Sequence, residues 1–360
     1  RTYWKMAGNC FIPISPELNQ VIALRRFVFM AILAAVVVLS LGCISPTDEG
    51  GKAAEKKSAG ITTLRIGYQP STHQIAEIVA AEKGWWKEDL QPFGVSSIEE
   101  KEFQSGPPEM QAMLAGAIDI AYVGTAPTIT AIAEGLDAKI VASVNINGSD
   151  LLLRPDKEYS GPKSLEGMSI ATFPAGSIQD IVIKKWLEDN GVDISKITFH
   201  GMGPGEAVTA IEAGKVDGVF LPHPSPSKIE LDNKGITVVQ SGEMWPHHAC
   251  CSLLVSGKLL REQPDLVDQI IKTHIRTTEY VNANPDEAAE IYAKRTKQDL
   301  AVVKASIERW DGEWVSNPEI QISSTVEYAR VDKQLGYINK SLSEDDLFDS
   351  SFYHQALAPA

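Results

Sequence analysis

Two stretches of the chain repeat one helix–strand pattern at a long interval. Met110–Pro127 reads MQAMLAGAIDIAYVGTAP and Ala207–Pro224 reads AVTAIEAGKVDGVFLPHP, and Gly116 of the first copy falls 98 positions before Gly214 of the second. Each copy has a helix-like run that ends at a glycine, then an aspartate, then an apolar run that ends in a Gly- or Pro-rich turn. A repeat interval this long predicts two similar lobes and not a short-period solenoid. The alternative is that two ordinary helix–strand units are alike by chance.

Short apolar runs alternate with helix-like runs on both sides of this repeat. The run Ile118–Val123 is continuous and bounded by glycine, as expected of a strand buried on both faces. We predict strands at 63–68, 97–103, 118–123, 139–146, 169–173, 196–200 and 216–221, and helices at 75–83, 107–116, 127–135, 178–191 and 206–214. This alternation predicts an α/β protein whose parallel sheets are covered by helices on both faces.

Two crossings of the chain are expected to join the lobes. We place the first near Leu151–Arg154 and the second in the strand His248–Ser256, after which the sequence is nearly all helical. The helices predicted there are 264–282, 285–296, 298–310 and 324–338. Lobe one is then discontinuous. The predicted parts are 61–153 with 252–345 for lobe one, 154–251 for lobe two, and a C-terminal tail at 346–360.

The first 60 residues are predicted to direct the protein to the membrane and not to form part of the folded lobes. Arg25–Arg26 precedes Phe27–Gly42, a run of 16 residues without a charge, and Cys43 follows. A basic segment and then an apolar segment are typical of a secretory signal, and this run is short for a membrane span. Leu39–Cys43 (LSLGC) resembles a lipobox, so we predict that residues 1–43 are a leader and that Cys43 is lipidated. The alternatives are an uncleaved signal anchor and a chance match.

Residues 44–60 are polar and contain almost nothing to bury, which predicts a flexible tether. Either a lipid on Cys43 or an uncleaved anchor would hold the protein on the extracytoplasmic face of the cell membrane, in a periplasm or at the cell exterior. We therefore expect a membrane-anchored protein that works outside the cytoplasm.

The chain is acidic, with 47 Asp and Glu residues against 33 Lys and Arg and a formal net charge of −14. A nucleic-acid partner requires a basic surface, so the composition excludes this class of partner. A field of this sign also repels anions, so any anion site must be built locally. Cys250 and Cys251 are neighbours, and adjacent Cα atoms are closer together than an ordinary disulfide requires. We expect no structural disulfide between them.

Four turns rich in Ser, Thr, Gly and Pro follow predicted strands and open predicted helices. They are Gln104–Pro108, Gly124–Pro127, Pro174–Ser177 and Gly201–Gly205. In an open α/β sheet, ligands bind beyond the carboxyl ends of the strands, so these helix N-termini should meet at one crevice. Their free N–H groups and positive dipole ends favour an anion, although any single turn would be explained by helix capping alone. The candidate ligand contacts are Ser105, Gly106, Gly124, Thr125, Gly176 and Ser177.

A segment rich in His and Cys precedes the second crossing. Glu243–Cys251 reads EMWPHHACC, and Pro222–Pro224 adds another histidine. Soft metals bind such side chains, but the spacing is not that of a zinc finger, and strand alternation would point Cys250 and Cys251 to opposite faces. We therefore predict no metal site. The candidate ligand contacts in this region are His223, Trp245 and His248, with packing roles as the alternative.

Catalytic motifs are absent from the sequence. It contains no G-x-S-x-G, H-E-x-x-H, P-loop or C-x-x-C motif. Asp119 and Asp217 look like the paired carboxylates of an enzyme, but each lies at the amino end of its predicted strand, which is the end of the sheet away from the crevice. We expect both aspartates to bond to backbone groups, and we expect the protein not to be an enzyme.

Several segments resemble the nitrate/sulfonate/taurine group of ABC-importer substrate-binding proteins. The matching segments are Leu64–Tyr68, Ala81–Glu88, Ser105–Pro107, Ala115–Gly124, Thr125–Pro127, Asn147–Ser149 and Ser164–Gly167. The resemblance covers roughly 61–340 and implies a type II periplasmic-binding-protein fold, in which two lobes enclose a hinged cleft. The segment Glu243–Cys251 departs from the pattern of the group. The ligand contacts that the resemblance implies are Ser105, Gly106, Gly124, Thr125 and Ser177.

The same resemblance implies a function. The protein would capture a small anionic solute, such as a sulfonate, nitrate or bicarbonate, and deliver it to an ABC permease and its ATPase subunit, as a monomer and without a cofactor. The ligands of the group vary, so the resemblance does not name the solute. One alternative is an enzyme of pyrimidine or menaquinone precursor synthesis on the same fold, which should lack a leader. Another is an extracytoplasmic sensor, which would need a signalling partner.

Overall fold

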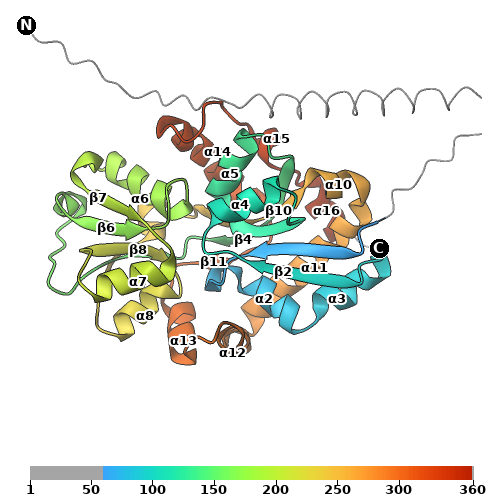
Figure 1. Ribbon diagram of the computed structural model, residues 1–360, viewed down its shortest axis with the longest axis horizontal. Helices are drawn as coiled ribbons and strands as arrows, with labels where there is room; N and C mark the ends of the chain where they lie inside the picture. The colour runs from blue at the N-terminus through green and yellow to red at the C-terminus, as the bar shows by residue number, and fades with distance from the viewer. Residues whose placement is uncertain (1–59, 359–360) are drawn as a thin grey trace, which may run out of the picture. The chain divides into compact units, whose positions relative to one another are not determined.

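The computed structural model describes residues 60–358 (Figure 1). The predictions for the leader, for Cys43 and for residues 44–59 of the tether lie outside the described residues. Within 60–358 the strands form two sheets, and helices connect them. In the same range no helix is both long enough and apolar enough to cross a bilayer. The predicted α/β class is confirmed.

The first sheet forms lobe one and has the strand order β11-β4-β10-β3-β1-β2. Its strands are β1 (Thr63–Tyr68), β2 (Ser97–Glu102), β3 (Ile120–Gly124), β4 (Ala138–Ile146), β10 (Ala249–Ser256) and β11 (Glu313–Trp314). β1 lies between β2 and β3 and is parallel to both. The helices among the first strands are α2 (Ile75–Glu82), α3 (Trp85–Leu90), α4 (Gly106–Leu114) and α5 (Thr125–Ala133).

The second sheet forms lobe two, in green and yellow in Figure 1, and has the order β7-β6-β8-β5-β9. Its strands are β5 (Ser149–Leu153), β6 (Ser169–Thr172), β7 (Thr198–Gly201), β8 (Gly218–Pro222) and β9 (Ile236–Gln240). Its helices are α6 (Ile178–Asp189), α7 (Pro204–Glu212), α8 (Ser225–Leu231) and α9 (Ser241–Met244). β6 lies between β7 and β8 and is parallel to both, as β1 is to β2 and β3. The sequence repeat therefore marks equivalent places in the two sheets.

The two sheets are mixed, whereas the sequence predicts parallel ones. β10 runs antiparallel between β3 and β4, and β5 runs antiparallel between β8 and β9. Each of these two strands is the first after a crossing, so it enters its sheet from the other lobe and runs against its neighbours. The hydrophobic pattern of a buried strand does not record its direction, which is why the prediction failed here.

The crossings lie earlier in the chain than predicted. Ser149–Leu153, predicted as part of lobe one, pairs with the second sheet, and Ala249–Cys251, predicted as part of lobe two, pairs with the first. The first crossing is therefore at Asn147–Gly148. Gly148 has φ +94°, and a Cβ there would lie 2.8 Å from Nε2 of His73, so this close approach requires glycine.

The helical C-terminal region belongs to lobe one. Its helices are α10 (Gly257–Glu262), α11 (Pro264–Ala283), α12 (Pro285–Thr296), α13 (Leu300–Arg309), α14 (Glu319–Gln334), α15 (Glu344–Leu347) and α16 (Ser351–Leu357). The predicted C-terminal tail is not separate from the fold. Phe348 is buried and bridges to Ile140 of β4, and α16 packs on α11, so residues 344–357 complete lobe one.

Equivalent aspartates tie neighbouring strands together at one edge of each sheet. Asp119 accepts a hydrogen bond from the backbone N–H of Arg65 at 2.9 Å, and Asp217 accepts one from the backbone N–H of Ser169 at 2.8 Å. The reciprocal bonds, from the aspartate N–H to the carbonyl of the same partner, are both 2.8 Å long. The prediction that these carboxylates bond to backbone is confirmed.

Candidate functional site

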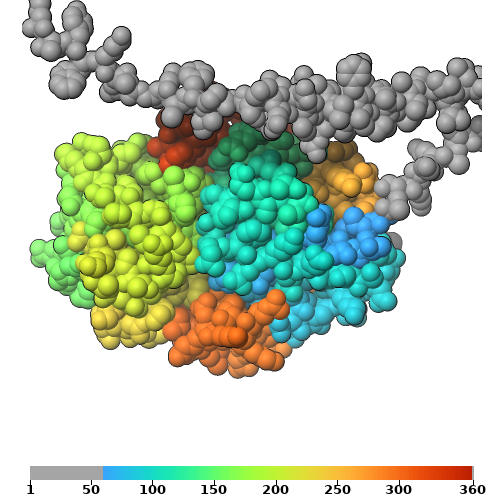
Figure 2. Space-filling view, in the orientation of Figure 1, coloured from blue at the N-terminus to red at the C-terminus, as the bar shows by residue number. Residues whose placement is uncertain are grey.

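A cavity of about 350 Å³ lies between the lobes, which is within the usual range of small-molecule sites. In Figure 2 the yellow-green surface of lobe two faces the teal surface of lobe one across a seam. Both lobes contribute residues to the cavity lining. A solute bound there would therefore touch both lobes at once.

The short helix α8 begins at the wall of this cavity, and so do the four helices that follow the predicted turns. The lining residues at these four helix starts are Gly106 of α4, Gly124 and Pro127 at α5, Ser177, Ile178 and Gln179 at α6, and Pro204 and Gly205 of α7. The N–H groups of a first helical turn have no partner within the helix, and the N-terminal end carries partial positive charge. The structure thus brings together the four turns that the sequence singled out, and their dipoles make the cavity wall electropositive.

The N-termini of α4 and α5 touch. A Cβ added to Gly106 would lie 2.3 Å from Cγ of Pro127, which is far inside van der Waals contact. Only glycine at position 106 therefore allows the two helix starts to lie side by side. Gly205 at the start of α7 is different, because a Cβ there would meet nothing within 4 Å.

Side-chain charge contributes little to the cavity. Within the described part of the chain, Lys228 is the only Lys or Arg in the lining, and its Nζ lies 3.6 Å from Oε1 of Glu212. Gln69 donates from Nε2 to Oε2 of Glu109 at 2.8 Å. Burial raises the pKa of Glu109 well above its usual value, which disfavours a negative charge on this carboxyl group. An anion in the cavity would be held by hydrogen bonds and helix dipoles.

The sequence-predicted contacts divide into those at the cavity surface and those behind it. Gly106, Gly124, Ser177 and His223 line the cavity, whereas Ser105, Thr125 and Gly176 are not among the lining residues. The Oγ1 of Thr125 is bonded at 2.7 Å to Oγ of Ser252, so this hydroxyl faces the sheet and not the cavity. The sequence pattern shows where the turns lie, but it does not show the direction in which each hydroxyl group points.

Trp245 and His248 do not reach this cavity. Trp245 packs on Tyr328 with ring centroids 4.5 Å apart, and it lines a separate hollow with residues of α14. His248 is buried, its Nδ1 lies 2.8 Å from the hydroxyl of Tyr328, and burial lowers its pKa to about 4. The prediction of ligand contacts from these two residues is corrected, because α14 covers them. Tyr328 is distant in sequence, so no local pattern shows this packing.

Three residues at the cavity wall were missed as a group: His73, Cys250 and Cys251. Nδ1 of His73 lies 3.2 Å from Sγ of Cys250, and the two sulfur atoms are 3.9 Å apart. The prediction that the two cysteines point to opposite faces of a strand is wrong, since their sulfur atoms are in contact. The hydrogen bond from Cys250, with a smaller contribution from His73, lowers the pKa of the Cys251 thiol. The sequence did contain one indication that His73 lies at the cavity. It follows β1, at the same edge of the sheet as the four predicted turns.

Comparisons with known proteins agree with this architecture. The putative aliphatic sulfonates-binding protein of Bacillus subtilis (strain 168) is 27% identical over 332 residues, covering 91% of this chain and 96% of that protein. The alkanesulfonate-binding protein SsuA from Xanthomonas axonopodis pv. citri bound to MOPS superposes with a TM-score of 0.72 at 20% identity, covering 81% of this chain and 99% of that one. The nitrate-binding protein NrtA from Synechocystis PCC 6803 gives 0.71 at 17% identity, covering 82% and 88%.

These structural similarities establish the two-lobed periplasmic-binding-protein fold. The family model described as NMT1-like matches residues 57–296, which include all of lobe two and the elements of lobe one from β1 through α12. The chain therefore belongs to the NMT1-like family.

Proposed function

We propose that this protein is the extracytoplasmic solute-binding component of an ABC importer. The observation that carries the proposal is the convergence of four helix N-termini, two from each lobe, on one cavity. Relatives in the comparisons are sulfonate-binding and nitrate-binding proteins, which supports the same role. The protein binds and releases its solute unchanged and acts as a monomer that delivers the solute to a permease with its ATPase subunit.

The cavity favours an oxyanion that carries a short apolar group. Helix N-termini hydrogen-bond to sulfonate, carboxylate or nitrate oxygens without needing a lysine. Part of the lining is apolar, with Phe173, Ile178 and Val208 from lobe two. Bare nitrate would leave these side chains without a partner, whereas the hydrocarbon part of a small sulfonate would pack on them. Small organosulfonates are therefore our first choice of solute, ahead of nitrate and bicarbonate.

Closure of the lobes would link binding to transport. The two crossings, from β4 to β5 and from α9 to β10, lie side by side, since the backbone N–H of Asn147 donates to the carbonyl oxygen of His248 at 3.1 Å. A solute that contacts both lobes stabilises the closed state by its differential affinity for that state. The permease would then distinguish the loaded from the empty protein by the distance between the lobes.

Anchoring at the membrane completes the proposal. Cys43 lies outside the described residues, and the support for its lipidation is the basic and apolar pattern before it. Mass spectrometry of the membrane-extracted protein should show a lipid on residue 43. A Cys43→Ala variant should appear in the soluble fraction, and an unmodified cysteine in the membrane-bound wild type would refute this part.

The direct test is solute binding by the purified protein. We expect alkanesulfonates or taurine to raise the melting temperature, because a ligand at 100 times its Kd adds about 2.7 kcal/mol to the free energy of unfolding. Gly106→Ala should lower solute affinity at least about tenfold, because the new Cβ forces α4 away from α5. Gly203→Ala is the matched control and should bind normally, since Gly203 does not line the cavity and its Cβ would meet nothing closer than 3.9 Å. No stabilisation by any sulfonate, nitrate or bicarbonate would refute the proposal.

A further inference from the structure

One imidazole nitrogen and two sulfur atoms meet at the cavity wall. The donor atoms of His73, Cys250 and Cys251 all lie within 4.8 Å of one another, and the two sulfur atoms are 3.9 Å apart. A tetrahedral ion that makes two bonds of about 2.3 Å to sulfur holds the sulfur atoms about 3.8 Å apart. The sulfur atoms therefore already have the spacing that one shared ion requires.

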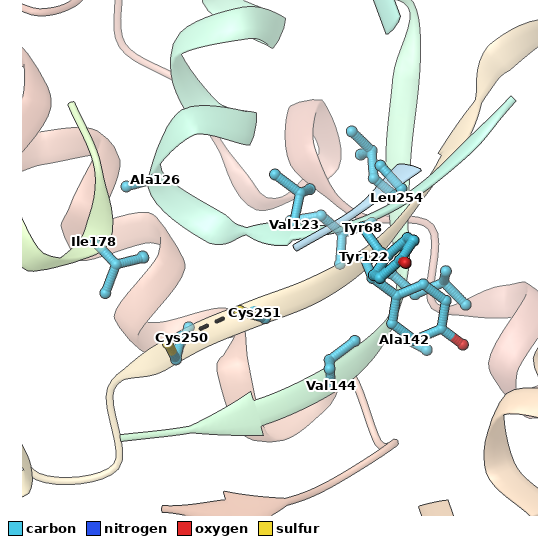
Figure 3. Packing of buried hydrophobic residues seen from close by; sticks show 14 of the residues in the cluster. Tyr68, Tyr122, Val123, Ala126, Ala142, Val144, Ile178, Cys250, Cys251 and Leu254 are labelled. Atoms are coloured by element: carbon cyan, nitrogen blue, oxygen red, sulfur yellow. Dashed lines mark hydrogen bonds between the residues drawn. The ribbon is translucent and has the colours of Figure 1, made fainter. Parts of the chain in front are cut away.

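A backbone irregularity brings the two cysteines together. Adjacent residues of a regular strand point to opposite faces, which would separate the sulfur atoms. The register of β10 against β4 shifts on both sides of Cys251, as a bulge does when it turns a side chain. Figure 3 shows the two cysteines next to each other at the start of β10, with the sulfur–sulfur contact drawn as a dashed line.

His73 is held in the orientation of a ligand. Its Nε2 lies 2.6 Å from the carbonyl oxygen of Gly148, and a carbonyl oxygen only accepts, so Nε2 carries the proton. Nδ1 then presents its lone pair toward Cys250, 3.2 Å away. Histidines that bind metals commonly donate their other N–H to a backbone carbonyl in this way. The missing side chain of Gly148 is what allows its carbonyl to reach the ring.

We propose that His73, Cys250 and Cys251 bind one thiophilic d10 cation, Zn²⁺ or Cu⁺, at the cavity wall. Two sulfur donors and an imidazole suit these ions, whereas Mg²⁺ and Ca²⁺ require oxygen ligands. All three residues line the cavity, so a fourth coordination position opens toward it. The site does not depend on the importer role, since the geometry involves residues of lobe one and the first crossing alone.

The test uses the full chain, reduced and stripped of metal, without solute. One arm titrates Zn²⁺ against a chromogenic chelator, and the other titrates Cu⁺ against a copper(I) chelator under anaerobic conditions. We expect one equivalent to bind, and the arm with the higher affinity identifies the ion. Cys250→Ser, Cys251→Ser and His73→Gln should each lower the affinity at least about 100-fold. His354→Gln, at an exposed histidine outside this group, is the matched control for His73→Gln and should keep the full equivalent.

A second measurement needs no variant. Co²⁺ added to the metal-free wild type should give an intense near-ultraviolet absorption from charge transfer between thiolate and cobalt, and Zn²⁺ or Cu⁺ should remove it. Absence of this band, together with no binding in either titration arm, would overturn the proposal, as would an unchanged equivalent in a Cys250→Ser/Cys251→Ser variant. Sulfonate binding is measured separately on the metal-free protein, so failure of the metal site leaves the solute proposal intact.

Discussion

The two copies of the repeated unit are alike at one end and different at the other. At the amino end of the strand, Asp119 and Asp217 make the same pair of bonds to the backbone of the neighbouring strand. At the carboxyl end, the first copy places Thr125 where the second places His223. Thr125 bonds to Ser252 behind the cavity wall, whereas His223 lines the cavity and bonds to the carboxylate of Asp150.

The amino ends of the two repeated strands therefore stabilise the fold in the same way, whereas their carboxyl ends differ in the chemistry that they place near the cavity. The shared ends lie away from the cavity, so both copies can keep the arrangement that best joins the strands. The different ends lie at or just behind the cavity wall, and there each lobe presents its own chemistry. In open α/β sheets the ligand binds beyond the carboxyl ends of the strands, which explains why the two copies diverge at that edge.

The largest expected loss of stability comes from replacing His223 at the carboxyl end of the second copy. His223→Leu would leave the buried Asp150 with two long hydrogen bonds, each of 3.4 Å, from Thr237 and Gln240. We expect a loss of about 2–3 kcal/mol in the free energy of unfolding, because a buried carboxyl group loses its shortest hydrogen bond. Urea unfolding measures this loss.

Thr125→Val is the matched control, at the equivalent position of the first copy. It removes one neutral hydroxyl bond and should cost about 1 kcal/mol. Equal losses in the two variants would mean that the two carboxyl ends do not differ in the way described. Adding Asp150→Leu to His223→Leu should recover much of the lost stability, since no buried carboxyl group is then left without its partner.

At the amino ends of the two strands we expect smaller losses of stability, equal in the two copies. Asp119→Asn and Asp217→Asn each weaken charge-assisted bonds from a neighbouring strand and from Arg65 or Lys157. Each should lower the free energy of unfolding by about 1.5 kcal/mol, and sulfonate affinity should stay within about twofold of the wild type. Thermal and urea unfolding, with calorimetric binding, test both statements. A large loss of affinity in either variant would show that these ends also shape the cavity.

The smallest effect is a dependence of stability on pH at Asp217, in the second copy. Burial works to raise the pKa of Asp217, but the ion pair with Lys157 and the bonds from Ser169 outweigh burial and lower the pKa from 3.8 to about 2. A pKa lowered by folding stabilises the protein above pH 3.8, and this contribution fades as the pH falls toward 2. The stability difference between wild type and Asp217→Asn should therefore shrink over that window. A difference that stays constant down to pH 2.5 would contradict the assignment.

Local patterns were sufficient for most of the fold. β1 spans the predicted residues, β2 and β4 differ from theirs by one residue at one end, and the four turns that open α4 to α7 occupy the predicted edge. Such features depend on residues close together in the chain, where hydrophobic alternation and Gly or Pro mark each boundary. The short elements β9, β11 and α8 were missed, because a few residues carry too little pattern.

The residue sequence by itself determined the alternating α/β plan, the duplication and the position of the turns that open α4 to α7, because these follow from the periods of helix and strand. Only the tertiary structure decided that β5 and β10 reverse direction, that α14 covers Trp245 and His248, and that Cys250 and Cys251 meet beside His73. Each of these depends on contacts between segments far apart in the chain. Distant pairing is set by packing and register, which a local pattern does not encode.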